Sequence, residues 1–324
     1  MTEAGTPLRR PRRGIPFRRF GGRLLEALAT LWLLLTLCFF LLRAAPGGPF
    51  DQEKAAPAAV IAQLNEQYRL DQPLWRQYLG YLGDLAHGDL GPSFQYPDYR
   101  VGELIAQALP ISALTGSLAL TLSLLAGVPL GVLAALRRRR WPDRLLMFFA
   151  GLGLALPKYV VAPLLVLLFA VTLQWLPAGG WSPGLGGWRG LVLPVLALSL
   201  PNLAYAARLT RASLIEVLGQ GYLRAARARG FREARVLFRH ALRPALLPVL
   251  AWLSPALINV VSGSIVVEQI FGIPGIGRYF VQGALNRDYT LVMGVVLVLG
   301  VAIVLINALI DWLRELADPR LRDA

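Results

Sequence analysis

Six long apolar segments constrain the fold of this chain more than any other feature. They lie at about 24–42, 110–136, 145–176, 191–207, 246–267 and 290–310. A helix that crosses the hydrocarbon core of a bilayer needs about 20 largely apolar residues, and five of the six segments reach or approach that length. The fourth is short and contains Pro194 and Pro201. The sequence therefore predicts an all-α integral membrane protein with six transmembrane helices.

The composition supports a membrane protein and argues against several other classes. Hydrophobic residues make up 56% of the chain and charged residues 16%, whereas soluble domains carry about 25% charged residues. One cysteine (Cys38) and two distant histidines (His87 and His240) predict neither a disulfide framework nor a metal site. Neither lysine, Lys54 or Lys158, follows a glycine, so the phosphate-binding loop of nucleotide-binding proteins is missing. We expect no metal, no nucleotide and no enzymatic activity of its own.

The basic residues predict the orientation in the membrane. Of the 33 Lys and Arg residues, 24 lie in the N-terminal tail, in the connections at 137–144 and 208–243, and in the C-terminal tail. Because Lys and Arg in short loops remain cytoplasmic, both termini and both connections are expected inside the cell. The net charge of +14 then faces anionic lipid and does not indicate nucleic-acid binding.

This topology divides the chain into parts with different surroundings. The parts are a cytoplasmic tail (1–23), a first transmembrane helix (24–42), an outer segment (43–109), a transmembrane core (110–313) with a cytoplasmic loop at 208–245, and a second cytoplasmic tail (314–324). In the outer segment, Trp75, Tyr78 and Tyr81 recur at helical spacing. This spacing predicts one or two amphipathic helices at the outer membrane surface, with an ordinary folded loop as the alternative.

The cytoplasmic loop contains a distinctive basic motif. Its residues 222–229 are rich in Ala and Arg, which favours a helix, and Gly230 follows where a left-handed helix end would fall. Beyond it, four arginines are predicted to share one helix face and four apolar residues the opposite face: Arg232, Arg235, Arg239 and Arg243 against Ala234, Leu237, Phe238 and Ala241. The pattern predicts a rigid basic projection into the cytoplasm; a loop held at lipid headgroups is the alternative.

Eight short segments carry a resemblance to a known family. They are residues 45–49, 85–93, 175–181, 224–230, 240–248, 271–277, 286–289 and 318–320. In this order and spacing, the chain resembles the membrane subunit of binding-protein-dependent ABC importers of the oligopeptide/dipeptide type. The resemblance extends over nearly the whole chain from about Phe20 onward.

The resemblance implies a fold, a location and a mechanism. It implies a type I ABC importer fold in the bacterial inner membrane, where this chain is one pore-forming permease beside a homologous second permease. Two separate ATPase subunits would bind ATP and Mg, and a periplasmic binding protein would deliver oligopeptides for alternating access. Dipeptides, nickel or another small solute are alternative cargoes. An ion-coupled secondary carrier is a more distant alternative, because ionisable residues are scarce within the spans.

In this family the alanine-rich cytoplasmic loop docks into a groove of the ATPase. The resemblance assigns that role to Tyr222, Arg224, Ala225, Ala226, Gly230 and Arg232. The sequence departs from the family pattern in two places. The acidic residue usually found near the alanine pair is absent, and Lys158 stands where a small polar residue is more common.

Two further sets of residues are candidates for the transport pathway. The first set, within or at the ends of spans, is Pro157, Lys158, Asn202, Asn259 and Glu268. A lysine at bilayer depth costs about 2.5–3.5 kcal/mol, so Lys158 either meets a peptide carboxylate or lies beside the Pro157 kink. Glu268 either accepts a peptide amino terminus or pairs with Arg278 or Arg287, and the two asparagines are expected to bond neighbouring helices.

The second set belongs to an outer turn rich in Gly and Pro, which forces the chain to change direction. It comprises Gly272, Pro274, Gly275 and Gly277. This turn is a candidate gate or contact for the binding protein; alternatively, it only connects two spans.

Overall fold

The computed structural model describes residues 17–50, 58–181 and 187–317, and within these ranges the regular structure is helical. The N-terminal part of the chain contributes α1 (Phe17–Ala44), α2 (Ala58–Gln67) and α3 (Leu74–Ala86). The core contributes α4 (Val101–Leu136), α5 (Trp141–Ala155), α6 (Lys158–Leu165), the π-helix η1 (Val166–Thr172), α7 (Arg189–Leu218), α11 (Leu247–Phe271), α12 (Ile276–Leu285) and α13 (Tyr289–Ala317). Between α7 and α11 lie α8 (Gly221–Ala228), α9 (Glu233–Arg235), the π-helix η2 (Val236–Ala241) and α10 (Leu242–Ala245).

The number of membrane-spanning segments agrees with the prediction, although one segment has a different shape. In the described residues, α1, α4, α7, α11 and α13 are each long and apolar enough to span a membrane. The sixth predicted span, 145–176, is two pieces, α5 and α6–η1, bent by 106°. The bend lies at Leu156, whose extended backbone (φ −82°, ψ 120°) is the conformation that a following proline imposes.

The helix that contains the fourth predicted span is longer than that span. Instead of 191–207, α7 runs without a break from Arg189 to Leu218, through both of its prolines. The helix therefore continues through residues 208–218, the first part of the predicted cytoplasmic loop. Backbone groups freed by a proline in a membrane helix are satisfied by neighbouring helices and nearby side chains, so proline does not end such a helix.

A close contact between α4 and α7 forms the centre of the molecule. Two glycines of α4 permit this contact: a Cβ atom on Gly131 would lie 2.4 Å from the carbonyl oxygen of Ala207, and one on Gly127 would lie 2.7 Å from that of Leu203. Ser123 Oγ also donates to Ser199 O across the same interface, at 3.0 Å. Small residues that allow two backbones to approach are typical of helix packing in membranes.

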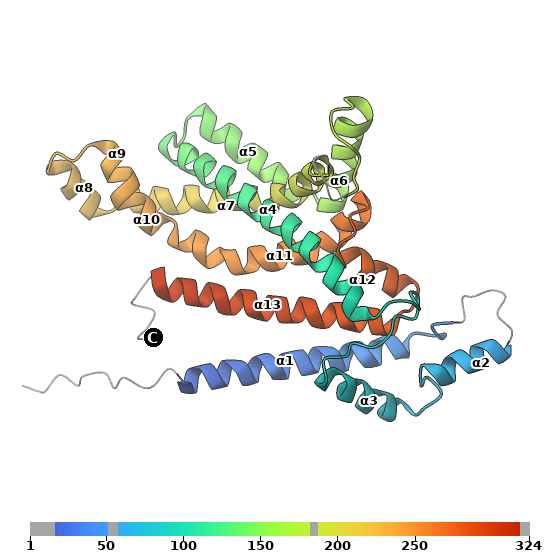
Figure 1. Ribbon diagram of the computed structural model, residues 1–324. Coiled ribbons are helices and arrows are strands. Elements are labelled where there is room, and N and C mark those ends of the chain that lie inside the picture. The colour runs from blue at the N-terminus through green and yellow to red at the C-terminus, as the bar shows by residue number, and fades with distance from the viewer. Residues whose placement is uncertain (1–16, 51–57, 182–186, 318–324) are drawn as a thin grey trace, which may run out of the picture.

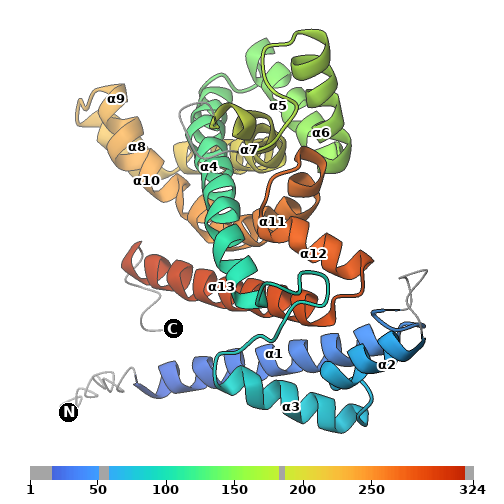
Figure 2. The same ribbon diagram turned by 45° about the vertical axis from the view of Figure 1, so that its right-hand side comes forward.

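The ends of the helices separate into two faces. In both ribbon views, the start of α1, the end of α13 and the α8–α9 region lie at one end of the molecule, whereas α2 and α12 lie at the other (Figures 1 and 2). The cytoplasmic loop and the described ends of the two basic tails thus share one face. This arrangement agrees with the orientation that the positive charges predict.

The outer segment contains two helices, as predicted, but α3 does not lie apart from the spans. It packs along α1, where the Tyr78 hydroxyl and Thr36 Oγ1 are 2.7 Å apart. Tyr78 and Tyr81 also contact a buried cluster formed by Leu35, Phe39 and Met293. The segment is therefore joined to the outer halves of α1 and α13.

Candidate coupling region and transport pathway

The predicted cytoplasmic helix is α8, and it ends as the sequence predicts. Arg229 caps its C-terminus, and the amide of Gly230 donates to Arg227 O at 2.9 Å. Gly230 has a left-handed backbone (φ +79°), which glycine adopts readily because it has no Cβ atom. The glycine thus turns the chain from α8 toward α9.

One face of α8 is buried against the rest of the subunit. Leu223 and Ala226 are 0% and 9% exposed. They belong to an apolar cluster, here called the coupling platform, that joins the cytoplasmic ends of α4 and α7 to η2 and α10: Ala135, Leu214, Leu223, Ala226, Val236, Ala241 and Ala245. Ala226 therefore contacts its own subunit and does not face outward. The exposed members of the predicted set are Tyr222, Arg224, Ala225, Gly230 and Arg232.

The prediction of two helix faces after Gly230 was partly wrong. The four arginines are all exposed, but Phe238 is 67% exposed and Ala234 is exposed as well. The buried positions are Val236 and Ala241. The reason is η2, whose π-helical turn adds residues between successive contacts and shifts the buried face relative to a 3.6-residue period.

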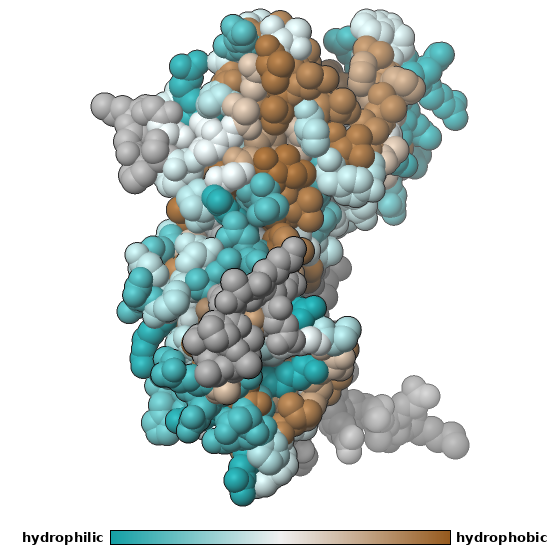
Figure 3. Space-filling model, turned by 90° about the vertical axis from the view of Figure 1, so that its right-hand side faces the viewer, coloured by the Kyte–Doolittle hydropathy of each residue, from teal (hydrophilic) through white to brown (hydrophobic). Residues whose placement is uncertain are grey.

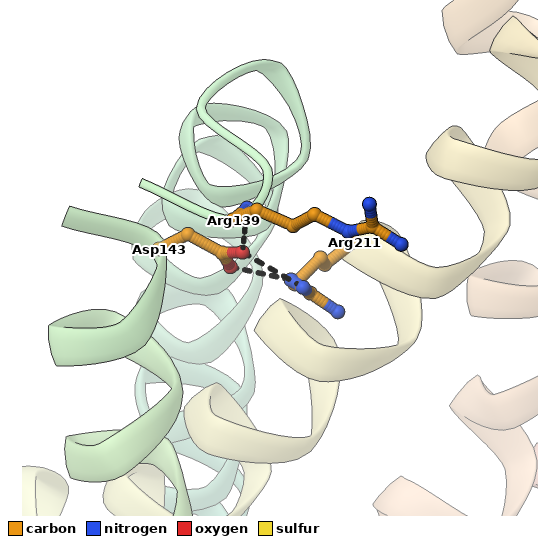
Figure 4. A network of polar contacts seen from close by, with 3 residues as sticks. All are labelled: Arg139, Asp143 and Arg211. Carbon is orange, nitrogen blue, oxygen red and sulfur yellow. Dashed lines mark hydrogen bonds and ion pairs between the residues drawn. The ribbon is translucent and has the colours of Figure 1, made fainter. Parts of the chain in front are cut away.

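An ion pair fixes the cytoplasmic end of α5 to α7 (Figure 4). Arg211 binds both carboxylate oxygens of the buried Asp143, at 2.6 and 2.8 Å. The backbone amide of Arg139, a residue with a left-handed φ of +64°, adds a third hydrogen bond at 2.9 Å. A bidentate, charge-assisted contact of this kind is stronger and more directional than a single hydrogen bond. The sequence alone does not indicate this ion pair, because the two residues are 68 positions apart.

Three of the five predicted pathway residues lie together. Lys158 Nζ donates to the carbonyl oxygen and to Oδ1 of Asn259, both at 2.8 Å. Asn259 Nδ2 in turn lies 3.5 Å from Oδ1 of the buried Asn202. This contact joins α11, which carries Asn259, to α7, which carries Asn202. Pro157 places Lys158 in this network, because α6 begins directly after it.

The remaining pathway residue, Glu268, is fully buried (0% exposed) and is separate from that network. It accepts the backbone amide of Gly277 at 2.8 Å. The described residues show no ion pair between Glu268 and Arg278 or Arg287: the side chain of Arg287 donates to Gly48 O at 3.3 Å. In this conformation Glu268 binds the outer turn and is not accessible to cargo.

The outer turn folds around this carboxylate. Gly272 ends α11 with a left-handed backbone, and α12 begins four residues later. A Cβ atom on Gly275 would lie 2.3 Å from Glu268 Oε2, and one on Gly277 would lie 2.3 Å from Ile265 Cα. The turn also contacts the 175–181 segment, since the amide of Gly180 donates to Phe271 O at 2.8 Å.

The sequence did not predict a role for Asp288, although segment 286–289 is one of those that carry the family resemblance. Asp288 is completely buried at the start of α13, where its carboxylate accepts Ser93 Oγ at 2.5 Å and the amides of Phe94 and Leu291 at 3.0 Å. Asp is a preferred residue at a helix N-terminus for this reason. Segments 85–93 and 286–289 of the resemblance therefore meet at one carboxylate.

The comparisons with known proteins agree with this architecture. The model of the family described as "Binding-protein-dependent transport system inner membrane component" matches residues 127–323. Oligopeptide transport system permease protein OppB of Salmonella typhimurium is 50% identical over 93% of this chain and 97% of its own length. The Escherichia coli K12 OppB is 47% identical over the same shares, and dipeptide transport system permease protein DppB of Bacillus subtilis is 38% identical over 91% of this chain and 94% of its own.

A solved structure shows the same fold. The inward-facing MetNI methionine ABC transporter aligns with a TM-score of 0.54 at 17% identity, over 66% of this chain and 96% of the MetNI chain. At that identity the alignment shows the fold alone, which is that of a type I ABC importer permease. The chain therefore belongs to the family of binding-protein-dependent transport system inner membrane components, as a multi-pass permease of the bacterial inner membrane.

Proposed function

We propose that this permease forms part of the pathway by which oligopeptides enter the cytoplasm. The observation that carries the proposal is the 50% identity to an oligopeptide permease over 93% of the chain, against 38% to a dipeptide permease over 91%. In this proposal a second, homologous permease completes the pathway and a periplasmic binding protein delivers the peptide. This chain binds no cofactor; ATP and Mg belong to two partner ATPase subunits.

The coupling region is proposed to receive the movement of the ATPases. The exposed side of α8 and its flanks, with Tyr222, Arg224, Ala225, Gly230 and Arg232, is the proposed contact surface. Because the coupling platform joins α8 to the ends of α4 and α7, a displacement of α8 moves those helix ends with it. The ATP-bound ATPase pair then favours one of two permease conformations, which is alternating access by a population shift.

The polar network at the α5–α6 bend is proposed to contact cargo. Lys158 carries three N–H donors, and its two hydrogen bonds to Asn259 leave one donor for the C-terminal carboxylate of a peptide. The Nδ2 atom of Asn259 donates to Oδ1 of Asn202, which helps to hold the Asn259 side chain in place. The outer turn, with Gly272, Pro274, Gly275 and Gly277 closed around Glu268, is proposed as the gate that the binding protein contacts.

Reconstitution tests the function. We expect liposomes with the four membrane-associated subunits and the binding protein to import a labelled pentapeptide only when ATP is present. This chain reconstituted alone should import none under a proton or sodium gradient. Gradient-driven uptake by the chain alone would overturn the proposal in favour of a secondary carrier.

The assignment of Lys158 has its own test. In the complete complex, Lys158→Met should reduce uptake of a pentapeptide with a free C-terminus but leave uptake of the C-terminally amidated peptide nearly unchanged. Methionine keeps most of the side-chain length and removes the charge. Equal losses for both peptides would show that Lys158 has only a structural role.

A further inference from the structure

A partly buried arginine, for which the described residues provide no ion pair, lies at the outer end of α1. The Nε atom of Arg43 donates to Gln77 Oε1 at 3.0 Å, and its guanidinium carbon lies 3.6 Å from the ring centroid of Phe39 and 5.3 Å from that of Tyr289. Its Nη1 atom is buried and has no hydrogen-bond partner. Within the described part of the chain, no carboxylate forms an ion pair with it. A charge that is partly removed from water is costly unless it is paired and hydrogen-bonded, so an anion bound here would be stabilising.

Space for an anion lies directly beside this guanidinium. A cavity of about 550 Å³ is lined by Arg43 and by Tyr81, whose hydroxyl is also buried and without a partner. Two exposed arginines, Arg69 and Arg76, line the same cavity. A second cavity of about 270 Å³ also contacts Arg43. Three arginines, Arg43, Arg69 and Arg76, therefore line the larger cavity.

The acidic residues of the cavity do not balance these arginines. Asp89 is already paired with Arg100, at 3.2 Å, and accepts the amide of Gly91 at 3.0 Å. Asp84 is exposed at the rim. The interior thus remains cationic, and arginine forks match the geometry of phosphate oxygens particularly well.

The surroundings of the cavity favour a lipid as the source of that phosphate. Arg43 is one residue from the end of the span Leu24–Ala44, which is the depth at which arginine meets headgroups. The same helix exposes Leu37, Phe40 and Leu41, and the cavity itself is lined by the exposed Trp75 and Leu79. Figure 3 shows the side of the molecule that lies at the right in Figure 1. In its lower part, at the height of α1 to α3 in Figure 1, hydrophilic residues gather on the surface and hydrophobic residues lie beside them.

We propose that this cavity binds the phosphate of a phospholipid from the outer leaflet, with Arg43 and Tyr81 on its inner wall and the exposed Arg69 and Arg76 at the entrance. The acyl chains would lie along the exposed apolar side of α1. Such a lipid supplies an anion to the guanidinium and connects α1 to α3. The site is separate from the cytoplasmic basic loops and from the proposed peptide pathway.

The experiment is native mass spectrometry and thermal unfolding of the full chain in detergent, with dioctanoyl-phosphatidylglycerol, dioctanoylglycerol or inorganic phosphate added. We expect a one-to-one adduct and a higher melting temperature with the phospholipid only. Arg43→Gln should weaken the adduct by roughly tenfold or more, the loss expected for one charge-assisted hydrogen bond. Arg189→Gln, which changes an exposed arginine outside the cavity, is the matched control and should bind as the unchanged chain does.

Each alternative result has a defined meaning. An equal response to inorganic phosphate would overturn the lipid assignment in favour of a free anion, and an equal response to dioctanoylglycerol would overturn the phosphate contact. If Arg43→Gln does not fold, the exposed pair Arg69→Gln and Arg76→Gln is measured in its place, and the same weakening is expected. Unchanged adducts in both variants would overturn the proposal.

Discussion

The coupling region and the outer turn both depend on glycine, but for different physical reasons. At the end of α8, Gly230 has open space around the position of a Cβ atom and a left-handed φ of +79°. In the outer turn, Gly277 lies in a helix, but its missing Cβ leaves room for Ile265 and Glu268. Gly230 is required for its left-handed backbone conformation, and Gly277 is required because no room exists for a Cβ atom.

This difference shows how the two regions are built. The coupling region is an exposed, charged projection on an apolar platform, so its surface is available to a partner. The outer turn is a buried assembly around one carboxylate, in which backbone atoms themselves make the contacts. Substitutions should therefore affect mainly transport in the first region and mainly folding in the second.

The largest effect is expected in the outer turn. Gly277→Ala places a Cβ atom 2.3 Å from Ile265 Cα and 2.9 Å from Glu268 Oε2. Because a backbone atom cannot rotate away as a side chain can, this overpacking should cost about 3 kcal/mol. Thermal unfolding of the purified chain measures it.

Gly102→Ala is the matched control for this substitution. Gly102 is also helical, but nothing lies within 4 Å of the position of its Cβ atom. Alanine is the better helix former by about 1 kcal/mol, so this variant should be as stable as the unchanged chain or slightly more stable. Similar unfolding temperatures for the two variants would contradict the steric explanation at Gly277.

The next effect concerns the ion pair between α5 and α7. Asp143→Ala removes both contacts to Arg211 and the contact to the Arg139 amide. We expect a loss of about 2 kcal/mol, below the range for a fully buried pair, because the side chain of Arg211 is 27% exposed and water screens part of its charge.

Asp143→Asn removes the charge of the side chain and keeps nearly the same shape. The amide can keep a hydrogen bond to Arg211 but not the ion pair, so its loss should lie between those of the unchanged chain and Asp143→Ala. Chemical denaturation of the three proteins gives the order. A loss for Asp143→Asn as large as that for alanine would show that the charge alone stabilises this contact.

The sequence predicted the regular, repetitive parts of this molecule well. Apolar length located the spans, and the Ala–Arg pattern with Gly230 located α8, since both signals are local. It did not predict the unbroken α7, because neighbouring helices offset the cost of Pro194 and Pro201. It also missed α12 and the buried roles of Glu268 and Asp288, whose partners come from distant segments.

A smaller effect on stability, but a clear effect on transport, is expected at Gly230. Gly230→Val forces a β-branched residue into a left-handed conformation, which costs about 1–2 kcal/mol. The strain should shift α8 relative to α9. Peptide uptake by the complete complex should then fall roughly fivefold or more if α8 couples this permease to the partner ATPase. Gly230→Asn is the control, because asparagine tolerates this conformation. Normal peptide uptake by the valine variant would contradict a coupling role for this turn.

The smallest effect is expected for the ion pair at the tip of the coupling region, where Arg227 Nε and Glu233 Oε1 are 2.9 Å apart. Their side chains are 37% and 72% exposed, so a double-mutant cycle with Arg227→Ala and Glu233→Ala should give a coupling energy of about 0.5 kcal/mol, decreasing as salt is added. A value above about 1.5 kcal/mol would show instead that surface charge stabilises the projection. The small value follows from the construction of this region: the platform beneath α8 supplies the stability, and its exposed charges remain available for a partner.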